Sequence, residues 1–180
     1  MAGSKSTIVL CEDEAQRLFI YRWLVARGLH PGEIRLLPLA AGMGAGTQHV
    51  LVRYPGEVGE YRTRANHVAA RRLIVAIDAD TSTVQQRLAA LDAALGQQPR
   101  QRTERICLLV PRRNVETWLH FLSQNTVTEE ADYKAQYAGD ALAPACERAG
   151  AAFETWHHAA QPTPGSPASL IAARAEATRV

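Results

Sequence analysis

Two aspartates, one residue apart, follow a short apolar run near the middle of the chain. Residues 73–77 are rich in β-branched types, and Asp78 and Asp80 come directly after them. A continuous apolar run of this length is typical of a strand buried in a parallel sheet. Open α/β sheets bind ligands at the carboxyl ends of their strands, so both carboxylates are expected to face a cleft. Paired carboxylates repel unless a cation intervenes, and Mg²⁺ or Mn²⁺ suits them. Alternatively, one aspartate caps the next helix, although residues 81–83 (Thr-Ser-Thr) can also do so.

Acidic residues also follow the two other strong strand candidates. The apolar run 7–11 ends in Glu-Asp-Glu at 12–14, and the run 105–110 is followed by Glu116 in the first turn of a helix. Strands joined by helical crossovers lie parallel with right-handed connections, so all three acidic groups are expected at one edge of the sheet. Such a cluster can bind one or two divalent cations and leave a glutamate as general acid or base. The expected metal ligands are Asp78, Asp80, Glu12 and Glu14, and the expected acid–base residues are Glu12 and Glu116.

Arginines form the expected nucleic-acid surface. Lysine occurs only at Lys5 and Lys134, and arginine suits bidentate contacts to phosphate. A genomic base composition that favours Arg, Ala and Gly explains the bias equally well. In the segment 48–70 arginines alternate with Tyr54 and Tyr61, which fits a nucleic-acid-binding face and a solvated helix face equally. The arginines assigned to nucleic acid, and to DNA rather than RNA, are Arg53, Arg62, Arg64, Arg112 and Arg113.

Further helices and loops are expected between the strands. Residues 15–27 and 83–95 carry apolar side chains at helical spacing, and Pro55 is expected near the start of another helix. Residues 33–39 form a weaker strand, and the proline within it favours an edge position. The glycine-rich loop 41–46 lacks the spacing of a P-loop, so a phosphate-cradling role is only weakly indicated.

The sequence of the C-terminal third indicates its secondary structure less clearly than the rest of the chain. Residues 140–153 are expected to form a helix, residues 169–180 an Ala-rich helix that frays, and the histidines at 157–158 a surface pair. Together these patterns predict a single α/β domain over the whole chain. Its fold is expected to be three-layered and Rossmann-like, with a mainly parallel central sheet flanked by helices. The core is expected within residues 5–122 and a helical extension within 123–180.

Composition narrows the class of protein. The 180 residues are 47% hydrophobic and 21% charged, which is ordinary for a globular domain, and the net charge of +2 does not by itself indicate nucleic acid. The three cysteines are far apart and odd in number, so buried free thiols are expected rather than disulfides or zinc. A short strand follows the N-terminal residues, and no apolar run has the length of a membrane span. We therefore expect a cytoplasmic protein without a membrane partner.

The acidic strand ends resemble the Toprim domain shared by topoisomerases, bacterial-type primases and nucleases of the overcoming-lysogenization-defect type. The resemblance rests on strand-Glu12-turn-helix, on strand-Asp78-Ala-Asp80-helix, and on Glu116 in the segment Pro-Arg-Arg-Asn-Val-Glu-Thr-Trp. This last segment and residues 167–170 are similar to small stand-alone Toprim-like proteins of bacterial defence islands. The resemblance covers residues 5–122 well and the rest loosely.

The resemblance implies a function and roles for these residues. Glu12 is implied as acid/base residue, Asp78 and Asp80 as Mg²⁺ ligands, and phage defence as the setting, with a separate ATPase subunit as a possible partner. The family has glycine directly after its first glutamate, where this chain has Asp13. This departure leaves Glu14 open as an alternative to Glu12.

Two other functions fit part of the pattern. The segment Ile-Val-Leu-Cys-Glu-Asp-Glu at 8–14 looks much like the start of a response-regulator receiver, in which Asp78 would accept phosphate. The long spacing from Glu12 to Asp78, the Ala-Asp after Asp78 and the absence of lysine after the strand 105–110 count against it. A module that binds nucleic acid or a partner protein without catalysis is the third possibility.

Overall fold

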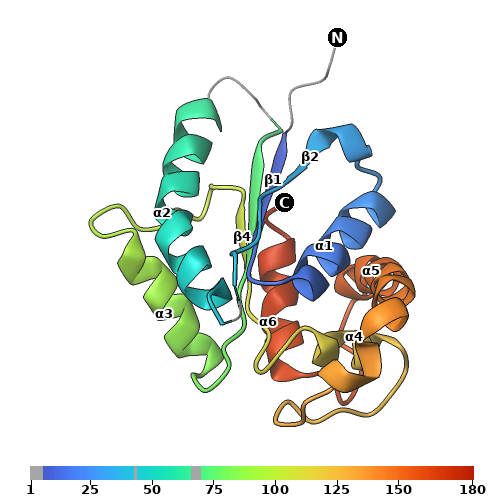
Figure 1. The fold of residues 1–180 in the computed structure, drawn as a ribbon. Helices are drawn as coiled ribbons and strands as arrows, with labels where there is room; N and C mark the ends of the chain where they lie inside the picture. Colours follow the sequence, from blue (N-terminus) through green and yellow to red (C-terminus); the bar gives the residue numbers. More distant parts are fainter. Residues whose placement is uncertain (1–5, 43, 66–69) are drawn as a thin grey trace.

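The computed structural model describes residues 6–42, 44–65 and 70–180, and within them four parallel strands form one sheet (Figure 1). The strand order is β2-β1-β3-β4, and every neighbouring pair is parallel. The predicted α/β class with a parallel sheet is therefore confirmed. The strands are β1 (Thr7–Cys11), β2 (Ile34–Leu36), β3 (Arg72–Ala76) and β4 (Ile106–Leu109).

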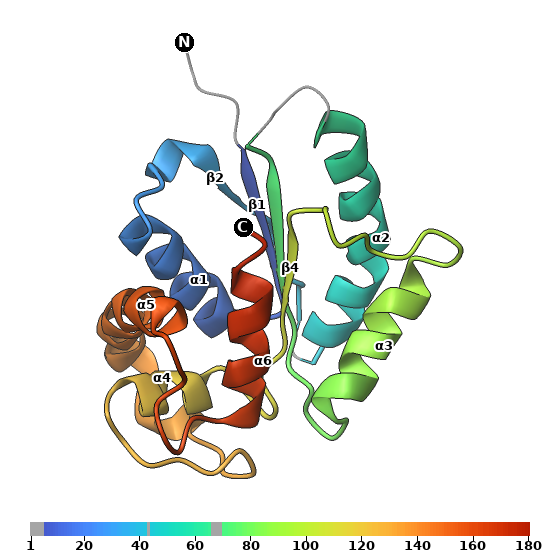
Figure 2. The same cartoon turned by 180° about the vertical axis from the view of Figure 1, so that it is seen from behind.

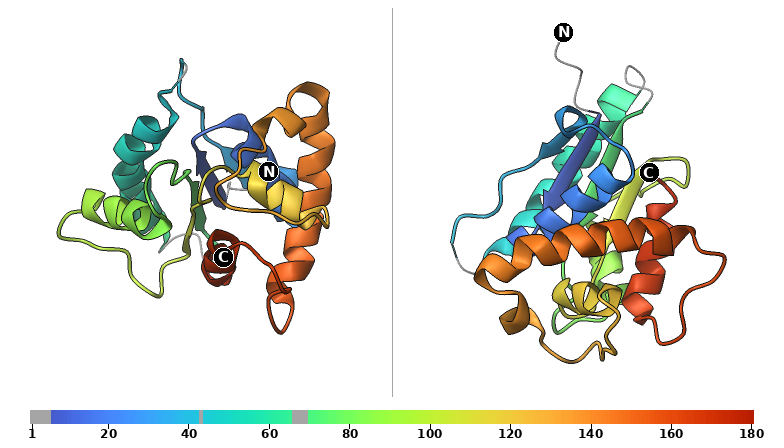
Figure 3. Two further views of the ribbon diagram at one scale, coloured as in Figure 1. Left: turned by 90° about the horizontal axis from the view of Figure 1, so that it is seen from below. Right: turned by 90° about the vertical axis from the view of Figure 1, so that its right-hand side faces the viewer.

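Helices cover both faces of the sheet and complete three layers (Figures 1 and 2). One face carries α2 (Gly46–Ala65) and α3 (Val84–Ala94); the other carries α1 (Glu14–Ala26), α4 (Glu116–Leu122), α5 (Leu142–His158) and α6 (Ala168–Ala177). Strand residues alternate between the two cores: Ile8 and Leu10 pack under α2, whereas Val9 and Cys11 pack under α1. Viewed from below, the sheet separates the two helical layers (Figure 3).

The helix α2 differs from the prediction. Pro55 was expected near a helix start, but it lies inside one twenty-residue helix that begins at Gly46. The physical reason is a buried stripe that continues across the proline, since Val50, Tyr54, Val58 and Tyr61 all face the sheet. Burial of these side chains outweighs the backbone hydrogen bond that a proline removes from a helix interior.

The final helix was also predicted wrongly as frayed, because α6 packs closely against β4. Leu170, Ala173 and Ala177 are buried in the core. Glu176 Oε2 accepts a 2.9 Å hydrogen bond from the Leu108 amide, and Arg100 pairs with Glu176 while donating to the Ile106 carbonyl. The last helix therefore belongs to the body of the domain.

Helix α5 packs along α1 through aromatic side chains. Phe153 contacts Trp23 edge-on at 5.2 Å between ring centroids, and the Trp23 indole nitrogen donates to Glu154. His157 is only 4% exposed, so the expected surface pair is wrong for this residue, whereas His158 is exposed. The three cysteines are free and buried, as predicted.

The strand order creates a crevice between β1 and β3. The chain runs from β1 outward to β2 and then returns to the other side of β1 to form β3. Crossovers therefore leave β1 and β3 in opposite directions, and ligands of open α/β sheets bind at the carboxyl ends of such a strand pair. Glu12 and Asp78 follow these two strands.

Candidate functional site

Glu12 follows β1 and lies beside the end of β3. Its Oε2 accepts a 2.9 Å hydrogen bond from the backbone amide of Asp78, and its Oε1 accepts a 2.7 Å bond from the Thr47 hydroxyl of α2. Burial raises the pKa of Glu12, although both hydrogen bonds oppose the rise. A carboxyl with a raised pKa at a strand end is suited to proton transfer near neutral pH.

Asp78 is 2% exposed and is held by Gln16 of α1. Gln16 Nε2 donates a 2.7 Å bond to Asp78 Oδ1, and Gln16 Oε1 accepts from the Glu12 amide at 3.0 Å. Burial raises the pKa of Asp78 well above its ordinary value, and the nearby charges of Asp13 and Glu12 add to the rise. A buried carboxyl in this setting favours either a proton or a bound cation.

Asp80 is exposed and adopts a left-handed backbone conformation, with φ of 53°. Non-glycine residues adopt this region rarely. The Arg112 guanidinium donates to the carbonyl oxygens of Asp80 and Ser82 at 2.7 and 2.8 Å, which fixes the turn after β3. Thr83 caps α3 by accepting from the Gln86 amide, so helix capping does not explain the aspartates.

Glu116 brings a fourth carboxylate to this edge from the first turn of α4. It is 6% exposed, and its Oε2 is buried with no hydrogen-bond partner among the residues that the structure describes. Burial raises the pKa of Glu116, and the charge of Asp13 contributes. An unpartnered buried carboxyl oxygen is costly, so this atom is suited to receive a proton or a cation.

Lys134 lies over the acidic residues from the short helix η2 (Lys134–Tyr137). Burial lowers its pKa, but attraction to Asp78, Glu116, Asp13 and Asp80 more than offsets this and raises it. The ammonium group is therefore the internal counter-charge of the site. A lysine beside carboxylates in this way can contact a phosphate oxygen that binds between them.

A cavity of about 400 Å³ lies beside the glycine-rich loop. Its wall includes Glu12, Asp80 and Lys134 together with Gly42, Gly44 and Gly46. At Gly46 a Cβ atom would lie 2.4 Å from Glu12 Cγ and 2.7 Å from the Glu12 carbonyl oxygen, so only glycine fits there. The loop thus packs directly against the acid–base candidate. Met43, within the loop, lies outside the described residues.

The predicted acids gather near Lys134 but do not form a closed cage. Glu12, Glu14 and Asp80 line the cavity, whereas Asp78 and Glu116 are buried beside it. Among the described residues, the one group of three His, Cys, Asp or Glu ligand atoms within 4.8 Å of one another is Glu154, His157 and His158. Arg27 lies 3.1 Å from His157 Nε2 in that group, which disfavours a cation there. At the strand ends a metal would therefore be held by one or two carboxylates with water, as Mg²⁺ commonly is.

Glu14 makes its ion pair within α1 rather than with the other strand ends. Its carboxylate pairs with Arg17 one turn along α1, although Glu14 also lines the cavity. By contrast, both Glu12 oxygens bond toward β3 and α2. The contacts therefore favour Glu12 over Glu14 as the acid–base residue.

The predicted nucleic-acid arginines lie in two regions. Three belong to α2, where Arg53 pairs with Glu57 and Arg64 with Glu60. Arg62 makes two bonds to Glu104 and two to loop carbonyls, at the opposite end of the sheet from the acids. The other region is the end of β4. Arg112 clamps the turn after β3, and exposed Arg113 lies 3.8 Å from Asp132.

The sequence patterns did not point to two residues of the site, Gln16 and Lys134. Gln16 looked like part of a polar helix face, and its position three residues after the N-cap Asp13 was the available signal. Lys134 lies 54 residues beyond Asp80 in a segment without clear periodicity. Its rarity, as one of two lysines, was the only signal that could have singled it out.

Comparison of the chain with protein-family models, with curated proteins and with solved structures finds no match in any of the three. The Toprim resemblance therefore rests on the residues quoted above. In the part of the chain that the structure describes, no helix combines the length and apolar character that a membrane crossing requires.

Proposed function

We propose that the protein carries out metal-dependent phosphodiester chemistry on nucleic acid, as a Toprim-type nuclease or nuclease subunit. The observation that carries the proposal is the convergence of Glu12, Asp78 and Glu116. They follow β1, β3 and β4 along the chain, and burial raises the pKa of all three. Glu12 lines a cavity together with Lys134, and the charges of Asp78 and Glu116 act on the same lysine. Burying a carboxyl costs folding stability, and carboxyls with shifted pKa values cluster at functional sites. The clustering of three such groups therefore supports a chemical role over a structural one.

The donor set suits a hard divalent cation. Asp78 and Asp80 offer carboxylate oxygens, and Glu116 Oε2 is buried without a partner in the described part of the chain. When bound, Mg²⁺ or Mn²⁺ would neutralise phosphate charge and polarise the P–O bond.

The side chains then divide the remaining work. Gln16 orients Asp78, while Thr47 and the Asp78 amide fix the Glu12 carboxyl. Glu12 takes the proton from the attacking water or gives one to the leaving oxygen. Lys134 contributes positive charge where the phosphate would lie, and exposed Arg113 lies near the same edge.

The experiment is calorimetric titration of Mg²⁺ and Mn²⁺ into the wild type and the Asp78→Ala/Asp80→Ala variant. Cleavage assays on plasmid and single-stranded DNA with Mn²⁺ follow. The proposal predicts binding and cleavage that are both lost in the folded variant. Absence of metal binding in the wild type would overturn it for the isolated chain.

The alternatives give different results in the same series. A receiver would take up phosphate from a small phosphodonor at Asp78, but the 2% exposure of that side chain and its bond to Gln16 disfavour in-line attack. A binding module would keep its nucleic-acid affinity in EDTA and show no turnover.

A further inference from the structure

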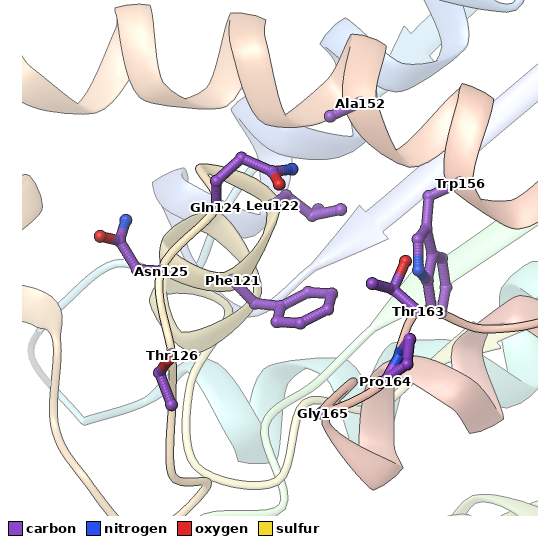
Figure 4. Close-up of a pocket in the computed structure, with 10 residues that line it drawn as sticks. All are labelled: Phe121, Leu122, Gln124, Asn125, Thr126, Ala152, Trp156, Thr163, Pro164 and Gly165. Atoms are coloured by element: carbon purple, nitrogen blue, oxygen red, sulfur yellow. The ribbon is translucent and has the colours of Figure 1, made fainter.

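A second cavity lies at the far end of α4, away from the acidic residues. It encloses about 280 Å³ between the end of α4, the segment Gln124–Thr126, the end of α5 and the loop at Thr163–Gly165. Figure 4 shows the Phe121 ring and the Trp156 indole on two sides of it. Its volume lies just below the range of about 300–1,000 Å³ typical of drug-sized ligands, so a ligand of one or two rings fits.

Among the described residues, the indole nitrogen of Trp156 has no hydrogen-bond partner, in contrast to those of the other two tryptophans. Trp23 Nε1 donates to Glu154 and Trp118 Nε1 donates to Ser169. Trp156 is 8% exposed, and its Nε1 is buried with no acceptor in the described part of the chain. In Figure 4 this nitrogen lies on the side of the ring toward Phe121 and Thr163. A buried N–H without an acceptor is unfavourable, so a ligand with an acceptor is favoured here.

The walls of the cavity indicate a flat, uncharged ligand. The rings of Phe121 and Trp156 stand at 80° with centroids 6.5 Å apart, forming a corner in which a planar ring can stack on one and meet the edge of the other. None of the described lining residues carries a formal charge. Polar atoms come instead from the amides of Gln124 and Asn125 at the rim.

Gln124 adds a second feature of the rim. Its backbone φ is 67°, one of two positive values among described non-glycine residues; the other belongs to Asp80 at the acidic site. Its exposed amide, which can donate and accept, is among the groups that line the cavity.

We infer that this cavity binds a neutral heteroaromatic ring with an edge carbonyl, the chemistry of a nucleobase. The carbonyl accepts from Trp156 Nε1, the ring packs on Phe121, and the Gln124 amide pairs with the opposite edge of the base. Because Trp156 Nε1 is closed to water, the loop Thr163–Gly165 shifts as the ligand enters. The inference does not rest on the proposed function, because none of the acidic strand-end residues lines this cavity.

The base comes either from a free nucleoside or from a single strand. Glu116 and Phe121 share α4 and lie about 7.5 Å apart along its axis, at about 1.5 Å per residue. A strand held by its base in this cavity would therefore pass near the acidic residues.

The test follows the three indole N–H resonances of the ¹⁵N-labelled full chain during titration with uridine in EDTA. Trp23 and Trp118 serve as internal references. We expect the Trp156 resonance, assigned by its loss in Trp156→Phe, to move downfield while the other two stay in place. A Trp156 resonance that does not move at millimolar uridine or oligouridine, or equal movement of all three, would overturn the inference.

Two variants test the contacts by calorimetry. Trp156→Phe keeps the ring but removes the donor and is expected to weaken uridine binding about tenfold. Gln124→Gly removes the rim amide at a position whose backbone favours glycine, so its fold is kept, and weaker binding is expected again. Unchanged affinity in a folded Gln124→Gly variant would contradict the role of the amide. Undiminished binding in Asp78→Ala/Asp80→Ala is expected, which separates this result from the metal site.

The source of the base is resolved by comparing ligands. Tighter binding of a short oligouridine than of uridine, with the same resonance moving, identifies a strand as the ligand. Equal affinities identify the free nucleoside.

Discussion

The backbone amide of Asp78 donates a 2.9 Å hydrogen bond to Glu12 Oε2, which ties the ends of two neighbouring strands through a candidate catalytic side chain. The bond fixes the Glu12 carboxyl in the crevice where the strand order reverses. It also places the charge of Glu12 beside buried Asp78, where this charge adds to the effect of burial in raising the pKa of Asp78.

Glu12→Gln is expected to lower metal-dependent cleavage at least 100-fold with little loss of stability. The glutamine oxygen can still accept from the Asp78 amide while its NH2 group donates to the Thr47 hydroxyl, but glutamine cannot transfer the proton. The measurement is the single-turnover cleavage rate, with thermal unfolding as the folding check. Glu14→Gln is the matched control, since Glu14 pairs with Arg17, and it should cleave at a near-normal rate. A larger defect in Glu14→Gln would reverse the assignment.

Asp78→Asn is expected to stabilise the metal-free chain at pH 8 relative to the wild type, because the variant no longer buries a charged carboxylate. The folded-state pKa of Asp78 is raised. The stability that its protonated form contributes to folding is therefore complete below the ordinary pKa of 3.8 and is lost as the pH rises through the folded-state pKa. The wild type in EDTA should therefore lose stability as the pH rises above about 4, and the variant should lose less. Urea unfolding between pH 5 and 8 measures this. Equal slopes for both proteins would show that Asp78 does not titrate differently on folding.

Added Mg²⁺ should reverse this loss in the wild type, because a ligand that binds only the folded state stabilises it. The Asp78→Asn protein should gain much less from Mg²⁺.

Lys134→Met is expected to separate metal affinity from catalysis. Removing the ammonium group strengthens the negative potential, so Mg²⁺ should bind about tenfold more tightly. Cleavage should nonetheless slow, because the variant lacks the positive charge beside the phosphate. Calorimetry and cleavage rates measured on the same preparation check both effects. Weaker Mg²⁺ binding in the variant would show that Lys134 organises the carboxylates rather than balancing their charge.

Gly46→Ala is expected to destabilise the protein by about 1–3 kcal/mol, because the new methyl group meets the Glu12 side chain and carbonyl. Cleavage should fall as Glu12 is displaced. Gly59→Ala is the control within the same helix. Its Cβ meets nothing within 4 Å, so the substitution should raise stability by about 0.5–1 kcal/mol. Similar unfolding midpoints for the two variants would contradict the close approach at Gly46.

The sequence predicted the sheet because apolar runs and acidic strand ends are local signals. The runs around Val9, Ile74 and Leu108 became β1, β3 and β4, and the weak run with a proline became the edge strand β2. The prediction of a helix start near Pro55 was wrong because it used only the local effect of a proline. The apolar stripe of α2 is buried against the sheet, and this tertiary contact keeps the helix continuous across Pro55.

Of the candidate site, the sequence predicted the carboxylates but not the residues that contact them. Gln16 contributes through its hydrogen bond to Asp78, 62 positions along the chain, and Lys134 comes from a segment without regular periodicity. No sequence pattern predicts either pairing. Likewise, only the tertiary structure shows that Arg62 is engaged by Glu104.

The contact of Arg100 and Glu176 with β4 has a consequence for self-association. A strand at the border of a sheet offers free amides and carbonyls to any extended chain that meets it. Here the outward Leu108 amide and Ile106 carbonyl are already taken by this ion pair. At the opposite border, β2 has three residues and is followed closely by Pro38, which cannot donate a backbone hydrogen bond. Both borders of the sheet are thus poor templates for an added strand.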